Sequence, residues 1–333
     1  MFRFLVALCA TAIATEAFAG PGEPVRIGLV REASAGPLYI AVAAGYFQAE
    51  GLEPQVEFLP THALVAAAVA SSKIDFGFSE LSARFYRDAA AHRLKIIASQ
   101  ASDRAGFPMY ALLIGDKAHR AGFADLRGLP GARIGVARSE PGAYYGLFSV
   151  ASRFGLATGR IKVTWLESPR DELTALSRAD IDAALLPFAT AVQSAGKGDT
   201  LLRLSDLTSS QQGVLFAATQ SIAIRRSVVE RFIRAYQRGA ADYQLNFLNY
   251  DDAGDFIPGP NYGADLDLIA RQSRVPARTL AMAKTYCDRR ANLDVADIRR
   301  QVKFWQEQGQ LDRSIEAADL LDLSFIGEEP VAQ

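Results

Sequence analysis

The chain has 333 residues, of which 50% are hydrophobic and 22% are charged, so it is long and apolar enough to bury one large core or two smaller ones. Its 36 Lys and Arg residues balance 37 Asp and Glu residues, for a net charge of −1. This balance removes the usual reason to expect nucleic acid or an anionic membrane surface as a partner.

The first residues have the three-part pattern of a secretory signal peptide. Arg3 supplies a positive charge, residues 4–14 form an uncharged apolar run, and Ala17-Phe18-Ala19 places small residues at a cleavage site. The run is shorter than the roughly 20 apolar residues that span a bilayer, which disfavours a membrane anchor. We therefore predict a signal peptide at 1–19, cleavage after Ala19, and a soluble periplasmic product.

The two cysteines predict neither a lipid anchor nor a disulfide. Leu8 precedes Cys9, whereas a lipoprotein site needs a small residue there, so the protein is not expected to be a lipoprotein. Cys287 is then the single cysteine of the mature chain, which excludes an internal disulfide. It can be a nucleophile, but a lone cysteine in a helical pattern is more often a small buried residue.

After the signal peptide, strand-like runs alternate with helix-like runs. Strands are expected at 25–30, 56–58, 74–78 and 95–99, and helices at 37–45, 61–72 and 81–92. Pro37 begins the first helix and Gly45 ends it, which follows the preference for Pro at the first turn and Gly after the last. This order predicts a mostly parallel sheet with helices on its faces.

The same alternation then repeats. Strands are expected at 133–136, 161–165 and 181–185, and helices at 142–154, 171–177 and 188–196. Lys73-Ile74-Asp75 and Asp180-Ile181-Asp182 each begin a short apolar strand after a helix, at the equivalent step of both series. The repetition predicts two similar α/β lobes.

Two apolar runs, 109–114 and 214–224, are interpreted as the strands that cross between the lobes. The second leads into a helix at 228–248, which has apolar residues spaced for one buried face. The remainder, 264–321, is helical in pattern. We therefore assign 20–112 and 217–333 to lobe 1, which includes the C-terminal helices, and 113–216 to lobe 2.

Four segments, in order, carry a family pattern. They are GPLYIA at 36–41 with GYF at 45–47 and EGL at 50–52; KIDFGF at 73–78; DLRG at 125–128 with ARIGV at 132–136; and GQLD at 309–312 with DLLD at 319–322 and Phe325. Together they resemble the SsuA/THI5-like solute-binding proteins, the nitrate, sulfonate, taurine and thiamine-precursor branch. Ser72 departs from the pattern, because the family commonly has Gly there.

The resemblance implies an α/β type II periplasmic-binding-protein fold, with two lobes joined by a two-strand hinge. It implies a monomeric receptor, not an enzyme, that closes on a small organic molecule of sulfonate, pyrimidine or aromatic type. The receptor then delivers that molecule to an ABC transporter permease in the inner membrane. Two alternatives stay open, a periplasmic sensory protein and a THI5-like enzyme of pyrimidine or thiamine-precursor synthesis. Those enzymes are intracellular and use a cysteine-rich signature that is absent here.

Ligands of open parallel sheets bind outside the carboxyl ends of the strands, and the expected strand ends nominate a set of loops. The candidate ligand-binding residues are Ser34, Tyr39, Thr61, His62, Ser79, Glu80, Arg104, Phe107, Ser139, Glu140, Gly142, Ala143, Tyr144, Glu167 and Phe188. We expect the ligand's polar end at the helix start near Ser139, and its flatter part on Tyr39.

The charge of the ligand stays open. The helix starts at Thr61 and Ser139 can bind a carboxylate, sulfonate or phosphate, although ordinary capping explains both residues equally well. Glu80 and Glu140 can receive an amine or an aminopyrimidine, whereas Arg104 and Arg138 can hold an acid. Five aromatic residues can form a wall for a flat ligand; they are Tyr39, Phe107, Tyr144, Tyr145 and Phe188.

The sequence contains no recognised catalytic or metal motif. G-x-S-x-G, H-E-x-x-H and the P-loop pattern are all absent. His62, His92 and His119 lie on unrelated segments, without the spacing of metal ligands. We therefore expect no catalytic residue, no metal and no cofactor.

Overall fold

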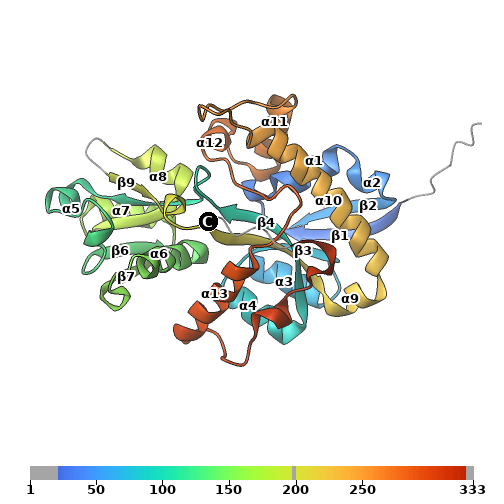
Figure 1. The fold of residues 1–333 in the computed structure, drawn as a ribbon, viewed down its shortest axis with the longest axis horizontal. Helices are drawn as coiled ribbons and strands as arrows, with labels where there is room; N and C mark the ends of the chain where they lie inside the picture. Colours follow the sequence, from blue (N-terminus) through green and yellow to red (C-terminus); the bar gives the residue numbers. More distant parts are fainter. Residues whose placement is uncertain (1–21, 197–199, 328–333) are drawn as a thin grey trace, which may run out of the picture.

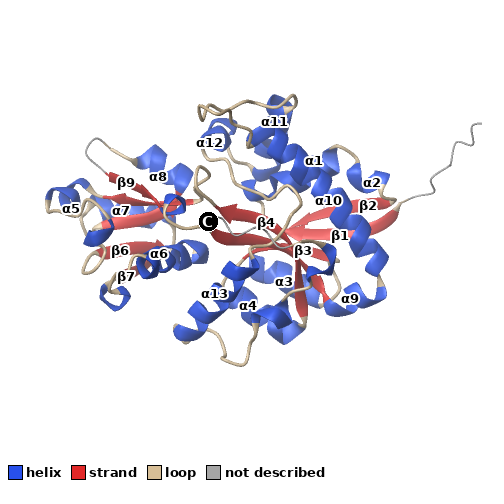
Figure 2. Cartoon of the chain, viewed as in Figure 1, coloured by secondary structure: helices blue, strands red, loops and turns tan. Residues whose placement is uncertain are grey.

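A computed structural model describes residues 22–196 and 200–327, so the predicted signal peptide at 1–19 lies outside the described residues. Two lobes lie side by side, and each contains a five-stranded sheet covered by helices (Figures 1 and 2). The lobe at the right of Figure 1 contains the N-terminal strands and most of the C-terminal helices. The predicted two-lobed α/β fold is confirmed.

The sheet of lobe 1 has the order β2-β1-β3-β10-β4. Its strands are β1 (Glu23–Leu29), β2 (Leu52–Phe58), β3 (Phe76–Glu80), β4 (Leu94–Asp103) and β10 (Ser210–Ala218). β1 runs parallel to β2 and β3, whereas β10 runs antiparallel to β3 and β4. The helices between its strands are α1 (Gly36–Ala43), α2 (Tyr46–Ala49), α3 (His62–Ala70) and α4 (Ala83–His92).

The sheet of lobe 2 has the order β7-β6-β8-β5-β9, which is the same arrangement. Its strands are β5 (Tyr110–Ile114), β6 (Arg133–Ala137), β7 (Lys162–Leu166), β8 (Ala183–Pro187) and β9 (Thr200–Arg203). β6 is parallel to β7 and β8, and β5 is antiparallel to β8 and β9. Its helices are α5 (Asp116–Arg120), α6 (Pro141–Arg153), α7 (Pro169–Ser177) and α8 (Phe188–Ser194).

Local sequence signals explain where several helices begin and end. The Thr61 hydroxyl accepts from Leu64 N–H at the start of α3, and the Ser82 hydroxyl accepts from Phe85 N–H at the start of α4. Pro37 lies in the first turn of α1, and Gly45, just past its end, has φ of 72°. That left-handed backbone favours glycine, and the helix matches its predicted bounds of 37–45 to within two residues.

The lobes are joined through residues 104–109 and 204–209, which lie between the strands of the two sheets. The two apolar runs expected to cross behave differently: β5 lies wholly in the sheet of lobe 2, and β10 lies wholly in the sheet of lobe 1. Lobe 2 therefore ends before β10, rather than at the expected residue 216. The second run is a strand only as far as Ala218, because Thr219–Ile224 form a helix. The strand parts of both runs are apolar because they are central strands buried on two faces, which says nothing about where the chain crosses.

The C-terminal part adds helices to lobe 1. They are α9 (Thr219–Ile224), α10 (Arg226–Phe247), α11 (Tyr262–Ser273), α12 (Ala277–Met282) and α13 (Val295–Glu307). Helix α10 buries the predicted apolar face and packs against α1. Short 3-10 helices lie at 33–35, 126–128, 158–160, 204–206, 317–320 and 323–325.

Helix α13 lies in lobe 1 beside α4 and also packs against α6 of lobe 2 (Figure 1). Tyr145 of α6 contacts Phe304 of α13 edge-on, and its hydroxyl donates to Asp297 at 2.5 Å. None of the helices within 22–196 and 200–327 combines the length and apolarity that a membrane crossing needs.

Candidate ligand-binding site between the lobes

A cavity of about 640 Å³ lies between the lobes, at the carboxyl ends of the parallel strands. Its lining from lobe 1 includes Arg31, Glu32, Ser34, Thr61, His62, Glu80, Gln100 and Gln212, and its lining from lobe 2 includes Tyr110, Ser139, Glu140 and Pro187. A cavity of this size fits a small organic molecule. Of the residues expected to bind ligand, six line it: Ser34, Thr61, His62, Glu80, Ser139 and Glu140.

Glu80, the last residue of β3, joins the two lobes. Its Oε1 accepts hydrogen bonds from the Tyr110 hydroxyl at 3.0 Å and from Gly142 N–H at 3.1 Å, and both donors belong to lobe 2. Gly142 lies in the first turn of α6, where backbone N–H groups have no partner within the helix. The carboxylate of Glu80 therefore occupies the helix start that was expected to receive the ligand's polar end.

Gly142 is the residue that allows this close approach. A Cβ at this position would lie 1.9 Å from Gln212 Oε1 and 2.7 Å from Glu80 Oε1. Both distances are far below a normal contact, so a larger residue would push these side chains away from the start of α6. Gly142 thus contributes through its small size and its N–H group.

Glu140 precedes α6, and its Oε2 lies 3.2 Å from the same Tyr110 hydroxyl that contacts Glu80. A phenol carries one proton, so it donates to only one of two ionised carboxylates. Burial and the neighbouring Glu140 charge raise the pKa of Glu80 well above its usual range. Burial is also the main reason that the pKa of Glu140 rises to about 7. The pair therefore retains a proton near neutral pH.

Glu32, in the loop after β1, brings a third carboxylate to the cavity. Its Oε1 accepts from Gln100 Nε2 at 2.7 Å, and its Oε2 lies 3.8 Å from His62 Nε2. Gln100 Nε2 also lies 3.2 Å from the Ser34 hydroxyl. Gln100 is only 1% exposed, and its Oε1 has no hydrogen-bond partner among the described residues. This wall thus presents mainly oxygen acceptors.

The positive side chains near the cavity are engaged elsewhere. The Arg31 guanidinium stacks 3.6 Å from the centre of the Phe58 ring and donates to the Gln272 carbonyl at 2.6 Å. Arg138 is exposed, pairs with Glu167 at 3.3 Å, and lines a neighbouring hollow of about 480 Å³ that shares Thr61, His62, Glu80 and Ser139 with the cavity. The Arg104 guanidinium lies over the Tyr286 ring. Within the described residues, neither Arg104 nor Arg138 lines the cavity.

The expected aromatic residues take other positions, and the described lining of the cavity contains none of them. Tyr39 is buried, with its hydroxyl donating to the Glu32 carbonyl at 3.2 Å. Phe107 packs between Tyr250 and Tyr286 near the first crossing segment. Tyr144, like Tyr145, packs against α13, and Phe188 packs on the inner core of lobe 2. These rings stabilise the lobes and their junction.

The other nominated residues lie outside the lining of the cavity. Ser79 is fully buried, and its hydroxyl donates to the Glu80 carbonyl at 3.1 Å. Ala143 is fully buried in the core, and Glu167 is exposed beside Arg138. Sequence reasoning missed Tyr110 and Gln212 because it considered only the carboxyl ends of parallel strands. The amino ends of the antiparallel strands β5 and β10 meet the same sheet edge, as the pairs Tyr110–Pro187 and Gly213–Glu80 demonstrate.

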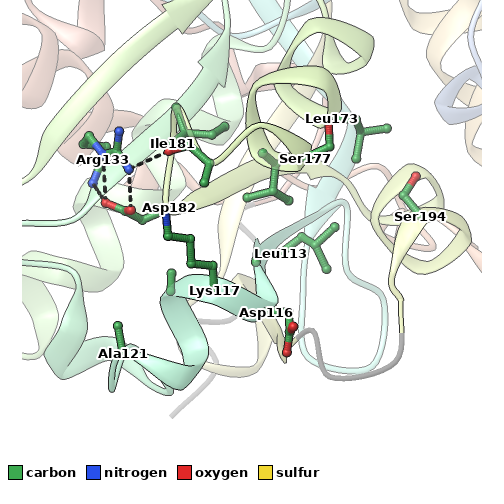
Figure 3. A pocket seen from close by; sticks show the side chains of 14 residues that line it. Leu113, Asp116, Lys117, Ala121, Arg133, Leu173, Ser177, Ile181, Asp182 and Ser194 are labelled. Carbon is green, nitrogen blue, oxygen red and sulfur yellow. Dashed lines mark hydrogen bonds and ion pairs between the residues drawn. The ribbon is translucent and has the colours of Figure 1, made fainter.

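A second cavity, of about 600 Å³, lies at the other end of lobe 2 (Figure 3). Arg133 and Asp182 form an ion pair at its wall, and Lys117 and Ser194 also line it. None of its described lining residues lines the cavity between the lobes. In the described part of the chain, no three His, Cys, Asp or Glu residues gather in a way that can hold a metal ion.

Solved structures share this fold. The alkanesulfonate-binding protein SsuA from Xanthomonas axonopodis pv. citri, bound to MOPS, is 15% identical with a TM-score of 0.63, over 92% of this chain and 100% of that chain. The periplasmic aliphatic sulphonate-binding protein SsuA from Escherichia coli is 13% identical with a TM-score of 0.67, over 90% and 97%. The desulfurization enzyme DSZB is 13% identical with a TM-score of 0.59, over 91% and 97%. These likenesses confirm the predicted periplasmic-binding-protein fold.

Comparison with curated proteins gives no match. The family model described as NMT1/THI5 like matches residues 32–246. The matched region begins in the loop after β1 and ends in the last turn of α10, so it contains all of lobe 2 and most of the sheet of lobe 1. The chain therefore belongs to the NMT1/THI5-like family.

Proposed function

We propose that the protein is an extracytoplasmic solute receptor, which binds a small organic molecule between its lobes and presents the closed form to an ABC importer. The observation that carries the proposal is the cavity of about 640 Å³ lined by both lobes. A ligand that contacts both walls stabilises the arrangement in which the walls are close, so binding is coupled to closure. The solute-binding relatives with this fold and the predicted signal peptide support the same function.

The connection between the lobes suits a hinge. Within the described chain, only the short segments 104–109 and 204–209 join the sheets, and Asp103 spans the first of them by accepting Met109 N–H at 2.7 Å. On one side of this junction, Gln193 of lobe 2 donates to the Thr279 hydroxyl of lobe 1 at 2.9 Å. Small backbone rotations in two short segments are enough to move one lobe against the other.

An enzymatic function is the alternative that the likeness to DSZB keeps open. Cys287, the one cysteine of the described residues, is 3% exposed and packs in the helical layer of lobe 1, outside the lining of the cavity. The cavity itself presents carboxylates, amides and hydroxyls. We therefore propose a monomeric binding protein, without a cofactor, that works with a permease in the inner membrane.

Closure is the property to test. A thermal-shift screen of amines, carboxylates and sulfonates identifies a ligand, because a molecule that binds only the folded state raises stability. Small-angle scattering with that ligand should show a smaller radius of gyration, while circular dichroism shows unchanged helix content. Identical scattering profiles at saturation would contradict the receptor proposal. Ligand-loaded protein should then support ATP-dependent uptake into inner-membrane vesicles, whereas closure without uptake would favour a sensory receptor.

A further inference from the structure

We infer that the ligand of this receptor carries a cationic group rich in hydrogen-bond donors, such as an amine, a guanidine or an amidine, held by Glu32, Glu80 and Glu140. The inference rests on the receptor function proposed above and names its ligand class. It separates this chain from the SsuA relatives, which bind sulfonates.

The first observation is the charge of the cavity wall. Three carboxylates line it, against Arg31 and His62 as the only basic side chains of the described lining. Arg31 is held by Phe58 and the Gln272 carbonyl, and His62 lies beside Glu32. An added anion would meet like charges in a partly buried space, whereas an added cation would relieve their repulsion.

The second observation concerns the start of α6, the position in lobe 2 best suited to an anion. Free N–H groups and the positive end of the helix dipole favour negative charge there. Glu80 of lobe 1 already occupies it through its hydrogen bond from Gly142 N–H. A sulfonate or carboxylate ligand would have to displace the carboxyl group of Glu80 from this position.

The third observation is a buried acceptor without a donor. Gln100 lines the cavity, is 99% buried, and uses its Nε2 on Glu32 and Ser34, which leaves Oε1 unpartnered among the described residues. An unpaired buried polar atom is costly, so a ligand that donates to it gains affinity. A carbonyl oxygen accepts and never donates, which again selects a donor-rich ligand.

Binding of a cation should release protons. Glu80 and Glu140 face Tyr110 and Glu32 within the cavity, with Glu172 of α7 behind Glu140 and with Arg31 and His62 on the opposite wall. Because the pKa of Glu140 is raised to about 7, protons compete with a cation below that pH. Affinity for a cation should therefore increase as the pH rises from 6 to 8.

The test uses probes that share a skeleton and differ in charge. Benzamidinium, phenylguanidinium and butylammonium are compared by calorimetry with benzoate, benzenesulfonate and butanesulfonate, using the purified protein at pH 6 and pH 8. We expect at least one cation to bind at least about tenfold more tightly than its anionic counterpart, with a larger difference at pH 8. Tighter binding of an anion, or no binding of any cation at millimolar concentration, would overturn the inference.

Variants connect the result to the named residues. Glu140→Gln should weaken cation binding by at least about tenfold without lowering the melting temperature, because it removes a charge and keeps the shape. Glu32→Gln is the second variant if Glu140→Gln does not fold. Glu57→Gln, on the exposed part of β2, is the matched control and should bind like the original protein. Unchanged cation affinity in both cavity variants would contradict the assignment.

The same samples separate this inference from the proposed function. An anion that binds and compacts the protein would overturn the ligand class and support the receptor. A cation that binds without any change in scattering would support the ligand class and contradict the receptor mechanism.

Discussion

The two lobes use the same internal ion pair and different residues at the site. In lobe 1, Asp75 accepts from Arg26 N–H at 2.8 Å and pairs with its side chain at 3.3 Å; in lobe 2, Asp182 does the same with Arg133, at 2.8 Å for both contacts. In each of the two ion pairs, the Arg and the Asp are 49 residues apart in the sequence. The two sheets thus repeat one frame, in which β1 is tied to the start of β3 and β6 is tied to the start of β8.

The lobes differ where the third strand ends. β3 ends at Glu80 and β8 ends at Pro187, and these residues face the antiparallel partners Gly213 and Tyr110. Lobe 1 therefore extends a carboxylate, while lobe 2 supplies the start of α6 and a phenol to receive it. The comparison teaches that the repeated frame places the site, and that the residue at the end of one strand decides its chemistry.

The largest effect is expected from breaking the contact between Glu80, at the end of β3, and the start of α6. Gly142→Ala places a Cβ within 1.9 Å of Gln212 Oε1 and should destabilise the protein by about 1–3 kcal/mol through overpacking. It should also weaken ligand binding, because Glu80 moves away from α6. Thermal melts and calorimetry measure the two effects. Gly159→Ala, with open space around its Cβ, is the control, and equal melting of the two variants would contradict the role given to Gly142.

The repeated ion pairs should differ in strength. Asp75 also pairs with Arg225 at 2.9 Å and is less exposed than Asp182, with side-chain exposures of 13% and 28%. Asp75→Ala should therefore cost about 2 kcal/mol, against about 1 kcal/mol for Asp182→Ala. Chemical denaturation measures both costs. A larger loss from Asp182→Ala would show that Arg225 adds nothing to the frame of lobe 1.

Acid should remove the contribution of Asp182 within a defined range. The hydrogen bond from Arg133 lowers the pKa of Asp182 below its usual 3.8, so ionisation stabilises the folded state above that pH. The stability is lost as the pH falls through the lowered pKa. The difference in melting temperature between the original protein and Asp182→Asn should therefore be constant from pH 7 to pH 5 and shrink below pH 4. A difference as large at pH 2 as at pH 7 would contradict the ion pair.

The smallest expected effect is that of Tyr39 in α1, which is compared with that of Tyr145 in α6. The Tyr39 hydroxyl donates to the Glu32 carbonyl at 3.2 Å, whereas the Tyr145 hydroxyl donates to the Asp297 carboxylate at 2.5 Å. Tyr39→Phe should cost about 0.5 kcal/mol, and Tyr145→Phe should cost about 1.5 kcal/mol because its bond is charge-assisted. Thermal melts of the two variants show which substitution lowers the melting temperature more. The reverse order would show that the contact between α6 and α13 is not a stabilising one.

The sequence by itself predicted the frame of this protein. Its signals are spacings of a few residues, and such spacings determine secondary structure locally. They are the apolar runs, Pro37 and Gly45, the cap at Thr61, and the repeated pattern that ends in Asp75 and Asp182. The two similar lobes follow from repetition of those signals. The positions of the crossing segments did not follow, because a buried central strand is equally apolar whichever lobe it belongs to.

Only the tertiary structure decided how the site is made. Glu80 meets Tyr110 and Gly142 across 30 and 62 residues of chain, and all three come from different elements of two lobes. No local spacing encodes that meeting, because it depends on how the lobes dock and on a glycine small enough to let a carboxylate approach. The same docking placed the expected aromatic residues in the core and the junction, since packing against α13 and the crossing segment buries more of each ring than the wall of a solvated cavity would.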